Sequence, residues 1–158
     1  LVGSEMCIRD RDLGMPILAG DTWDSNVIVG AAQGKDNVKI YVTTFYQEGG
    51  NAEFDAAFKE WINSDSVNLE NNGGNDMVAA VSVMGYDAYY VALEAIKAAG
   101  STDPAAVLAA LPSVNYAGVT GNIAFADGAK DATRDVAFIK YCNTETAVWD
   151  LIGEQGIE

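Results

Sequence analysis

Two short runs with the character of strands, each followed by a polar turn and then a helical pattern, restrict this chain to a few folds. The first run is MPILA at 15–19, followed by a polar turn at 20–25 and a helical stretch at 26–33 that Asp24 or Ser25 can cap. The second run is VKIYVTTFY at 38–46, which precedes another helical stretch. Because strand, loop and helix in this order form half of a βαβ unit, the pattern predicts an α/β fold with polar loops at the carboxyl ends of its strands.

The middle of the chain is predicted to be rich in helices. Asn51 can cap a helix that follows it. The apolar residues of this helix share one face and are Phe54, Phe58, Trp61 and Ile62. The asparagine-rich segment 63–75 predicts a surface loop, and Asp76 after it can cap a long helix at 77–99 that Gly100 ends.

The last third of the chain has a different character. An Asp-Pro pair at 103–104 predicts the start of a short helix at 105–111. After this helix we expect a turn and a strand at 118–125, and alternating apolar residues at 135–141 and 147–152 predict two more strands. The whole order is therefore helix-rich α/β structure that ends in a late antiparallel hairpin.

Composition and charge limit the partners of the chain. Of the 158 residues, 49% are apolar, which is enough for one globular domain with a core. The sequence has 23 acidic and 9 basic residues and a net charge of −14, whereas nucleic acid and anionic membranes require a basic face. No apolar run reaches the about 18 residues of a membrane helix. We expect no nucleic acid partner and no membrane insertion.

The residue types that most enzymes use are scarce. Histidine is absent, which removes the usual general base and the usual zinc ligand. The spacing of Cys7 and Cys142 fits neither a metal site nor a redox pair. No glycine-rich stretch has the pattern of a phosphate-binding loop, and the acidic stretch 127–135 lacks the spacing of a calcium loop. We expect a protein without enzymatic activity, cofactor or metal.

Residues 1–11, LVGSEMCIRDR, differ from the rest of the chain because they have neither an amphipathic period nor a helix cap. The string is similar to a translated sequencing-adapter remnant at the end of a metagenomic gene fragment. The alternative is a natural loop or strand cut at an arbitrary point. We expect residues 1–11, with Cys7, to take no part in the fold, which leaves Cys142 as a lone and at least half-buried thiol.

The loop AGDTWD at 19–24 is the strongest candidate for a binding site. The Asp21 carboxylate can form charge-assisted hydrogen bonds with an ammonium group. The neighbouring Thr22 hydroxyl and Trp23 indole can add a polar contact and a cation–π wall. The alternative is that Asp21 or Asp24 caps the next helix while Trp23 packs in the core, and the local pattern leaves both open.

Several stretches of the sequence resemble a known family, and they follow one another along the chain in the same order as in that family. The phrase GMPILAGDTWDS at 14–25 is similar to the periplasmic leucine/isoleucine/valine-type binding proteins, the type I solute-binding proteins of ABC importers. Later stretches also resemble that family: VKIYVTTFY with its helix, MGYDAYYVALEAIKAAG followed by DPAAVLAAL, and YAGVTGNIAFADG. The resemblance covers residues 12–158.

The resemblance implies a type I periplasmic-binding-protein fold, which has two Rossmann-like lobes, here truncated and with a late antiparallel hairpin. Residues 12–40 and 133–158 would belong to the carboxyl-terminal lobe. Residues 41–132 would belong to the amino-terminal lobe. Neither lobe would be complete, so sheet edges and apolar surface would be exposed.

The resemblance also implies ligand-binding roles. Asp21 would pair with the ligand's α-ammonium group, with Thr22 and Trp23 lining the pocket beside it. Tyr86 would present an aromatic ring to the ligand, and the alternative for Tyr86 is ordinary helix packing. The serine and threonine loops with which the family binds the ligand's carboxylate belong to an amino-terminal part that this sequence lacks, so at most half of a site is present.

The function that follows from the resemblance is extracytoplasmic solute binding. We expect a periplasmic protein, its signal peptide lost with the missing part, that closes about a hinge around a branched-chain or other amino acid and docks on the membrane permease of an ABC importer. One alternative is a binding protein for an amide or urea. Another is the ligand-sensing domain of a receptor with the same fold.

Overall fold

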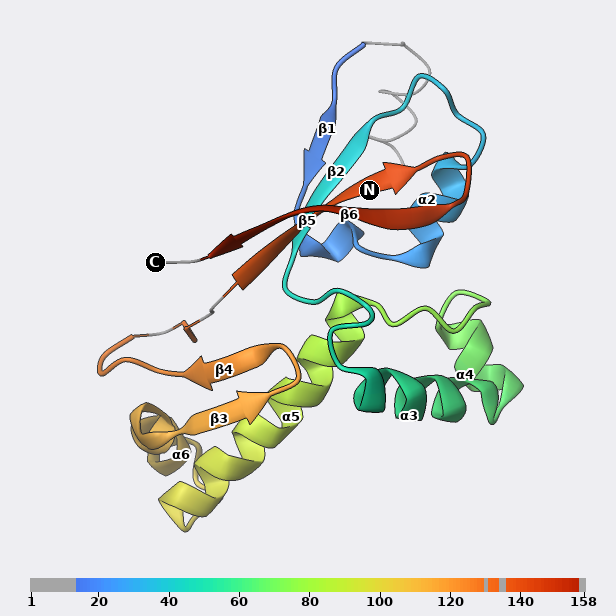
Figure 1. Ribbon diagram of the computed structural model, residues 1–158. Coiled ribbons are helices and arrows are strands. Elements are labelled where there is room, and N and C mark those ends of the chain that lie inside the picture. Colours follow the sequence, from blue (N-terminus) through green and yellow to red (C-terminus); the bar gives the residue numbers. More distant parts are fainter. Residues whose placement is uncertain (1–13, 130, 134–135, 157–158) are drawn as a thin grey trace.

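The computed structural model describes residues 14–129, 131–133 and 136–156 (Figure 1). These residues form two groups of elements, one around a four-stranded sheet and one around a long helix. The chain passes from the first group to the second and later returns. The expectations for residues 1–11, including the one for Cys7, lie outside the described residues.

The sheet group comprises residues 17–44 and 136–156. Its strands are β1 (Ile17–Ala19), β2 (Ile40–Thr44), β5 (Val136–Asn143) and β6 (Val148–Gly156), which lie in the order β1-β2-β5-β6. The first two strands are parallel and are linked by α2 (Asn26–Ala32), which completes the βαβ unit. β5 is antiparallel to both β2 and β6, which confirms the predicted late hairpin.

One face of the sheet packs against α2 and forms the core of this group. The buried residues of this sheet core are Val29, Ala32, Ile40, Val42, Cys142 and Trp149. Alternate residues of a strand point to the same face, which places the β2 and β5 members beside one another. As expected, Cys142 is buried. Burial raises the pKa of its thiol to about 11, so the side chain behaves as an apolar group.

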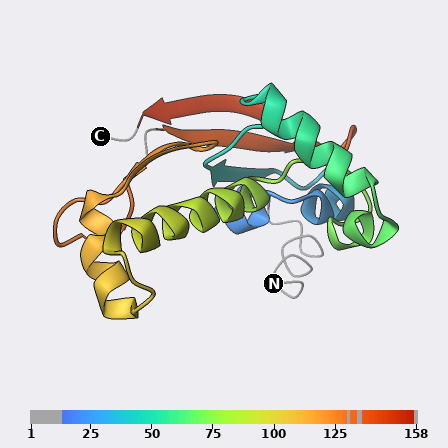
Figure 2. The same ribbon diagram turned by 90° about the horizontal axis from the view of Figure 1, so that it is seen from below.

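The helical group comprises residues 52–124. Its elements are α3 (Ala52–Asn63), α4 (Ser66–Asn71), α5 (Ala80–Ala99), α6 (Pro104–Ala110), the short 3-10 helix η2 (Leu111–Ser113), β3 (Asn115–Gly118) and β4 (Gly121–Ala124). Figure 2 shows α6 packed near the carboxyl end of α5, with α3 and α4 toward the other end. The predicted helix ends are confirmed, because Asn51 and Asp103 cap α3 and α6 and Gly100, with a φ of 59°, ends α5.

The prediction of a loop over residues 63–75 is wrong, because α4 lies within this segment. The carboxylate of Asp65 accepts a hydrogen bond from the backbone N–H of Val67 at 2.8 Å and caps the helix. A single turn and a half of helix has too few apolar positions to reveal a period in the sequence.

The predicted start of the long helix at residue 77, with Asp76 as its cap, is also wrong. α5 begins at Ala80, after an extended segment. Side chains satisfy the backbone groups of that segment, since Asn75 accepts a hydrogen bond from Met77 N–H at 3.1 Å and Glu48 accepts one from Val78 N–H at 3.0 Å. The backbone therefore does not need helical hydrogen bonds there.

A buried carboxylate joins α5 to the β3–β4 hairpin. Asp87 accepts hydrogen bonds from the backbone N–H of Val119 at 2.9 Å, from that of Thr120 at 2.8 Å, and from the Thr120 hydroxyl at 2.7 Å. The approach is so close that a Cβ at Gly118 would lie 2.7 Å from this carboxylate. A residue without a side chain is therefore required at position 118.

Candidate functional site

The strand-end loop that was predicted as a binding site forms one turn of 3-10 helix, η1 (Asp21–Trp23). The backbone N–H of Trp23 donates to Gly20 O at 3.1 Å, and that of Asp24 donates to Asp21 O at 2.9 Å. The turn follows the carboxyl end of β1 directly and contacts both β2 and α5. It therefore lies where the sheet group meets the helical group (Figure 1).

The three predicted site residues of this turn differ in exposure. Asp21 is half-buried, and no side chain or backbone group of the described chain donates a hydrogen bond to its carboxylate. Thr22 is exposed, and Trp23 is half-buried with its ring against the sheet core. The turn thus presents a carboxylate and a hydroxyl to the outside while the indole fixes it to the sheet.

Asp24 has a different environment from Asp21, because it is fully buried. Its Oδ2 atom forms an ion pair with Lys140 Nζ at 2.8 Å and accepts a hydrogen bond from the Thr44 hydroxyl at 2.9 Å. Of the residues predicted as possible caps of α2, Ser25 is confirmed, because its hydroxyl accepts a hydrogen bond from Ile28 N–H. Neither Asp24 nor Asp21 caps this helix.

The helical group touches the sheet group beside η1. Met77 packs against the sheet core together with Trp23. The Asn26 amide at the start of α2 donates hydrogen bonds to Asn75 Oδ1 at 2.8 Å and to the backbone oxygen of Asn72. A bound molecule next to η1 would therefore be within reach of both groups.

Tyr86 lies on α5 and is not brought together with η1. Its ring is 41% exposed and contacts Phe54 and Tyr90, with ring centroids 5.0 and 4.8 Å away. It lines an open groove of about 560 Å³ between α3 and α5, to which Phe58 and Trp61 also contribute. Residues 21–23 do not line this groove.

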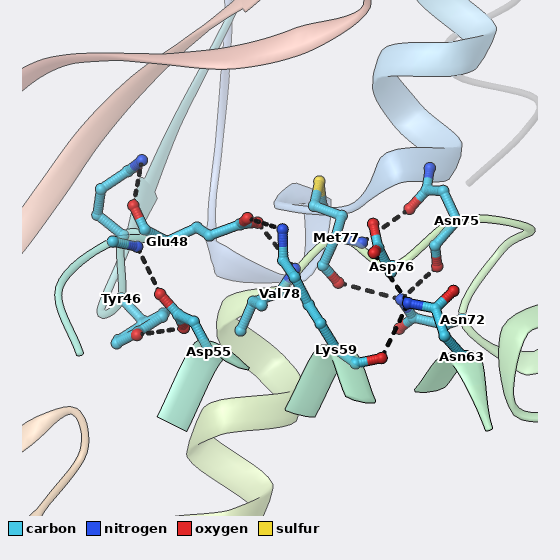
Figure 3. Close-up of polar contacts among 12 residues, drawn as sticks. Tyr46, Glu48, Asp55, Lys59, Asn63, Asn72, Asn75, Asp76, Met77 and Val78 are labelled. Carbon is cyan, nitrogen blue, oxygen red and sulfur yellow. Dashed lines mark hydrogen bonds and ion pairs between the residues drawn. The ribbon is translucent and has the colours of Figure 1, made fainter. Parts of the chain in front are cut away.

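The connection from β2 to α3 is held by two carboxylates (Figure 3). Asp55 accepts hydrogen bonds from the Tyr46 hydroxyl and from Gly49 N–H, each at 2.6 Å. Glu48 forms an ion pair with Lys59 and accepts the hydrogen bond from Val78 N–H. Burial and the Asp55 carboxylate raise the pKa of Tyr46 well above its ordinary value. The connection is therefore fixed to the helical group.

The described residues contain no cluster of three potential metal ligands. Within the same part of the chain, no helix has the length and apolarity to cross a membrane.

Comparison with known proteins agrees with this geometry. The family described as periplasmic binding protein matches residues 9–145. Among solved structures, the chain is similar to a leucine binding protein, LivK, from Thermotoga maritima, with 27% sequence identity and a TM-score of 0.64. The alignment covers 96% of this chain and 41% of the LivK chain. A search of curated proteins gave no match. The chain therefore belongs to the periplasmic binding protein family, is of the LivK kind, and has the type I fold of these non-enzymatic binding proteins.

Proposed function

We propose that this chain is the carboxyl-terminal part of an extracytoplasmic protein that binds a branched-chain or other amino acid and delivers it to the membrane permease of an ABC importer. The family supports solute binding, and the similar solved structure is described as a leucine binding protein. Because the chain spans 41% of that protein's length, the activity is that of the whole protein and not of this part alone.

Asp21 is the residue that supports an amino acid as the ligand. The half-buried Asp21 carboxylate accepts no hydrogen bond from the described chain, which leaves its oxygens available to water or a ligand. A ligand's ammonium group would supply the missing donors through charge-assisted hydrogen bonds. The exposed Thr22 hydroxyl is next to Asp21 and can add a donor, while the Trp23 ring packs against the sheet core and holds the turn in place.

We further propose that the two groups correspond to two incomplete lobes. The predicted bounds put residues 12–40 and 133–158 in the carboxyl-terminal lobe and residues 41–132 in the amino-terminal lobe. Because β2 stays in the sheet as far as Thr44, we place the bend between the lobes after Thr44 and not after residue 40. Hinge closure would then bring the helical group, including the exposed ring of Tyr86, toward a ligand held at η1.

Calorimetric titration of the complete protein, expressed from the parent gene, tests this function. We expect leucine, isoleucine or valine to bind, and binding to disappear for the matching acids that lack the amino group. Binding of an amide or urea with no response to any amino acid would contradict the proposal. Tyr86→Ala tests whether the ring reaches the ligand: weaker leucine binding supports this contact, and unchanged binding contradicts it.

A further inference from the structure

Lys140 is a buried cation beside the sheet core, on the face of the sheet that α2 and η1 cover. Lys140 is opposite Val42 in the β2–β5 pairing, and Val42 is buried in the sheet core. The side chains of Lys140 and Asp24 are 5% and 0% exposed, and their charged atoms are 2.8 Å apart. A register shift between Ile139 and Lys140 interrupts the pairing with β6 at this point. A buried charge requires a partner, and Asp24 supplies it.

This ion pair connects the sheet to the candidate site. Asp24 follows η1 directly, and its backbone N–H donates to Asp21 O at 2.9 Å. On its other side, Ser25 O accepts a hydrogen bond from the Trp149 indole at 3.2 Å. The end of the turn is therefore attached to β2 through Thr44, to β5 through Lys140 and to β6 through Trp149.

Only one of the two oxygens of the Asp24 carboxylate is held by other residues, so the contact with Lys140 matters for the position of Asp24. Asp24 Oδ2 accepts both hydrogen bonds, from Lys140 and from Thr44, whereas Asp24 Oδ1 is buried and has no partner in the described chain. Without Lys140, Thr44 alone would hold a buried carboxylate, and such a carboxylate would move toward water. Asp21 is three residues away within the same turn and would move with it.

We propose that Lys140 is a positioning residue for ligand binding: through Asp24 it sets where the Asp21 carboxylate lies. The inference rests on the proposed function, since it assumes that Asp21 binds an ammonium group. Lys140 itself does not contact the ligand. A purely structural role would lower stability without changing which ligands are preferred.

The test uses the complete protein and measures the dissociation constants of leucine and of isocaproate, which is leucine without its amino group. Their ratio reports the contact between Asp21 and the ammonium group. In the unmodified protein we expect leucine to bind about 100-fold more tightly. D21N should remove most of this preference, and K140M should do the same while binding of isocaproate changes by less than about threefold.

A second variant separates positioning from misfolding. K140M leaves the Asp24 charge buried and unpaired, whereas D24N/K140M removes both charges and avoids that penalty. We expect D24N/K140M to fold and still to lose the preference for leucine. K97M removes an ion pair of similar length, 2.7 Å to Glu94, on the exposed face of α5, and should keep the preference.

The outcomes are distinguishable. If K140M and D24N/K140M lower the melting temperature but keep a preference for leucine of about 100-fold, Lys140 is only structural and the inference is overturned. If K140M weakens leucine binding further in the D21N background, the two residues act independently, which also overturns it. If the unmodified protein shows no preference, or D21N keeps it, the proposed role of Asp21 fails and the inference falls with it.

Discussion

Cys142 is buried in the sheet core, where its thiol has no access to water. The pKa of this thiol is raised from the ordinary value of 9.0 to about 11, chiefly by burial and then by the charge of Asp150. A thiolate is the reactive form of cysteine. We therefore predict that an alkylating reagent at neutral pH modifies Cys142 only after the protein has been unfolded with urea, as mapped by peptide mass spectrometry. Rapid labelling of the folded protein would contradict the burial.

The same pKa shift predicts how stability depends on pH. Between about pH 9 and pH 11 the folded thiol keeps its proton while the unfolded thiol loses it, so the unfolded chain binds fewer protons. The free energy of unfolding should therefore fall as pH rises through this interval, by roughly 1 to 3 kcal/mol. Urea unfolding at several pH values measures this fall, and it should be smaller in a Cys142→Ala variant.

Single residues of the candidate site were predictable only where the information is local. Asp21, Thr22 and Trp23 are consecutive, and their place after a strand is visible in the sequence. Lys140 is 116 positions from Asp24, and no local rule joins them. The one available signal is a lysine between inward-facing Phe138 and Cys142 in an alternating strand, a position where an isolated charge needs a partner.

At the scale of elements, the link between α5 and the β3–β4 hairpin makes a sharp prediction. Replacing Gly118 by Ala should lower the free energy of unfolding by about 2 kcal/mol or more, because the new methyl group collides with the Asp87 carboxylate. Asp87→Ala should also destabilise, since it removes the carboxylate that accepts from the part-buried N–H groups of Val119 and Thr120.

The double variant of these two positions is the critical comparison. Asp87→Ala removes the group with which the Gly118→Ala methyl collides. The two costs should therefore not add, and the double variant should be clearly more stable than their sum predicts in urea unfolding. Additive costs would show that the close approach does not limit position 118.

Element boundaries were predictable where one residue type decides them. Asn51, Asp103 and Gly100 act through their own side chain or backbone conformation, and all three ends agree with the prediction. The start of α5 was not predictable, because Glu48, about 30 residues earlier in the chain, takes the hydrogen bond of Val78. Contacts across that distance override a local capping signal such as Asp76.

At the scale of the whole molecule, the described residues expose aromatic and apolar surface. Trp61 and Tyr89 are 57% and 65% exposed, and aromatic rings line the open groove between α3 and α5. β1, with an exposed Leu18, lies at the edge of the described sheet. Exposed apolar grooves and unpaired strand edges favour association.

We therefore predict that the isolated chain binds an apolar fluorescent dye, elutes in size-exclusion chromatography at a volume that depends on its concentration, and gives no heat with leucine. The complete protein is the control: it should bind leucine, bind no dye and elute at a volume that does not depend on its concentration. A monomeric isolated chain with a tight leucine isotherm would contradict the view that the other part of the pocket lies outside this sequence.

The ion pair between Asp24 and Lys140 also determines when the site can form during synthesis. A ribosome makes η1 before β5, and more than 100 residues separate the two, since the partners of the ion pair are 116 positions apart. Until β5 has emerged, β2 lacks its antiparallel neighbour and Asp24 has no counter-ion. Contacts between distant parts of a chain form slowly, so the loop that presents Asp21 should be among the last parts of the newly made protein to become ordered.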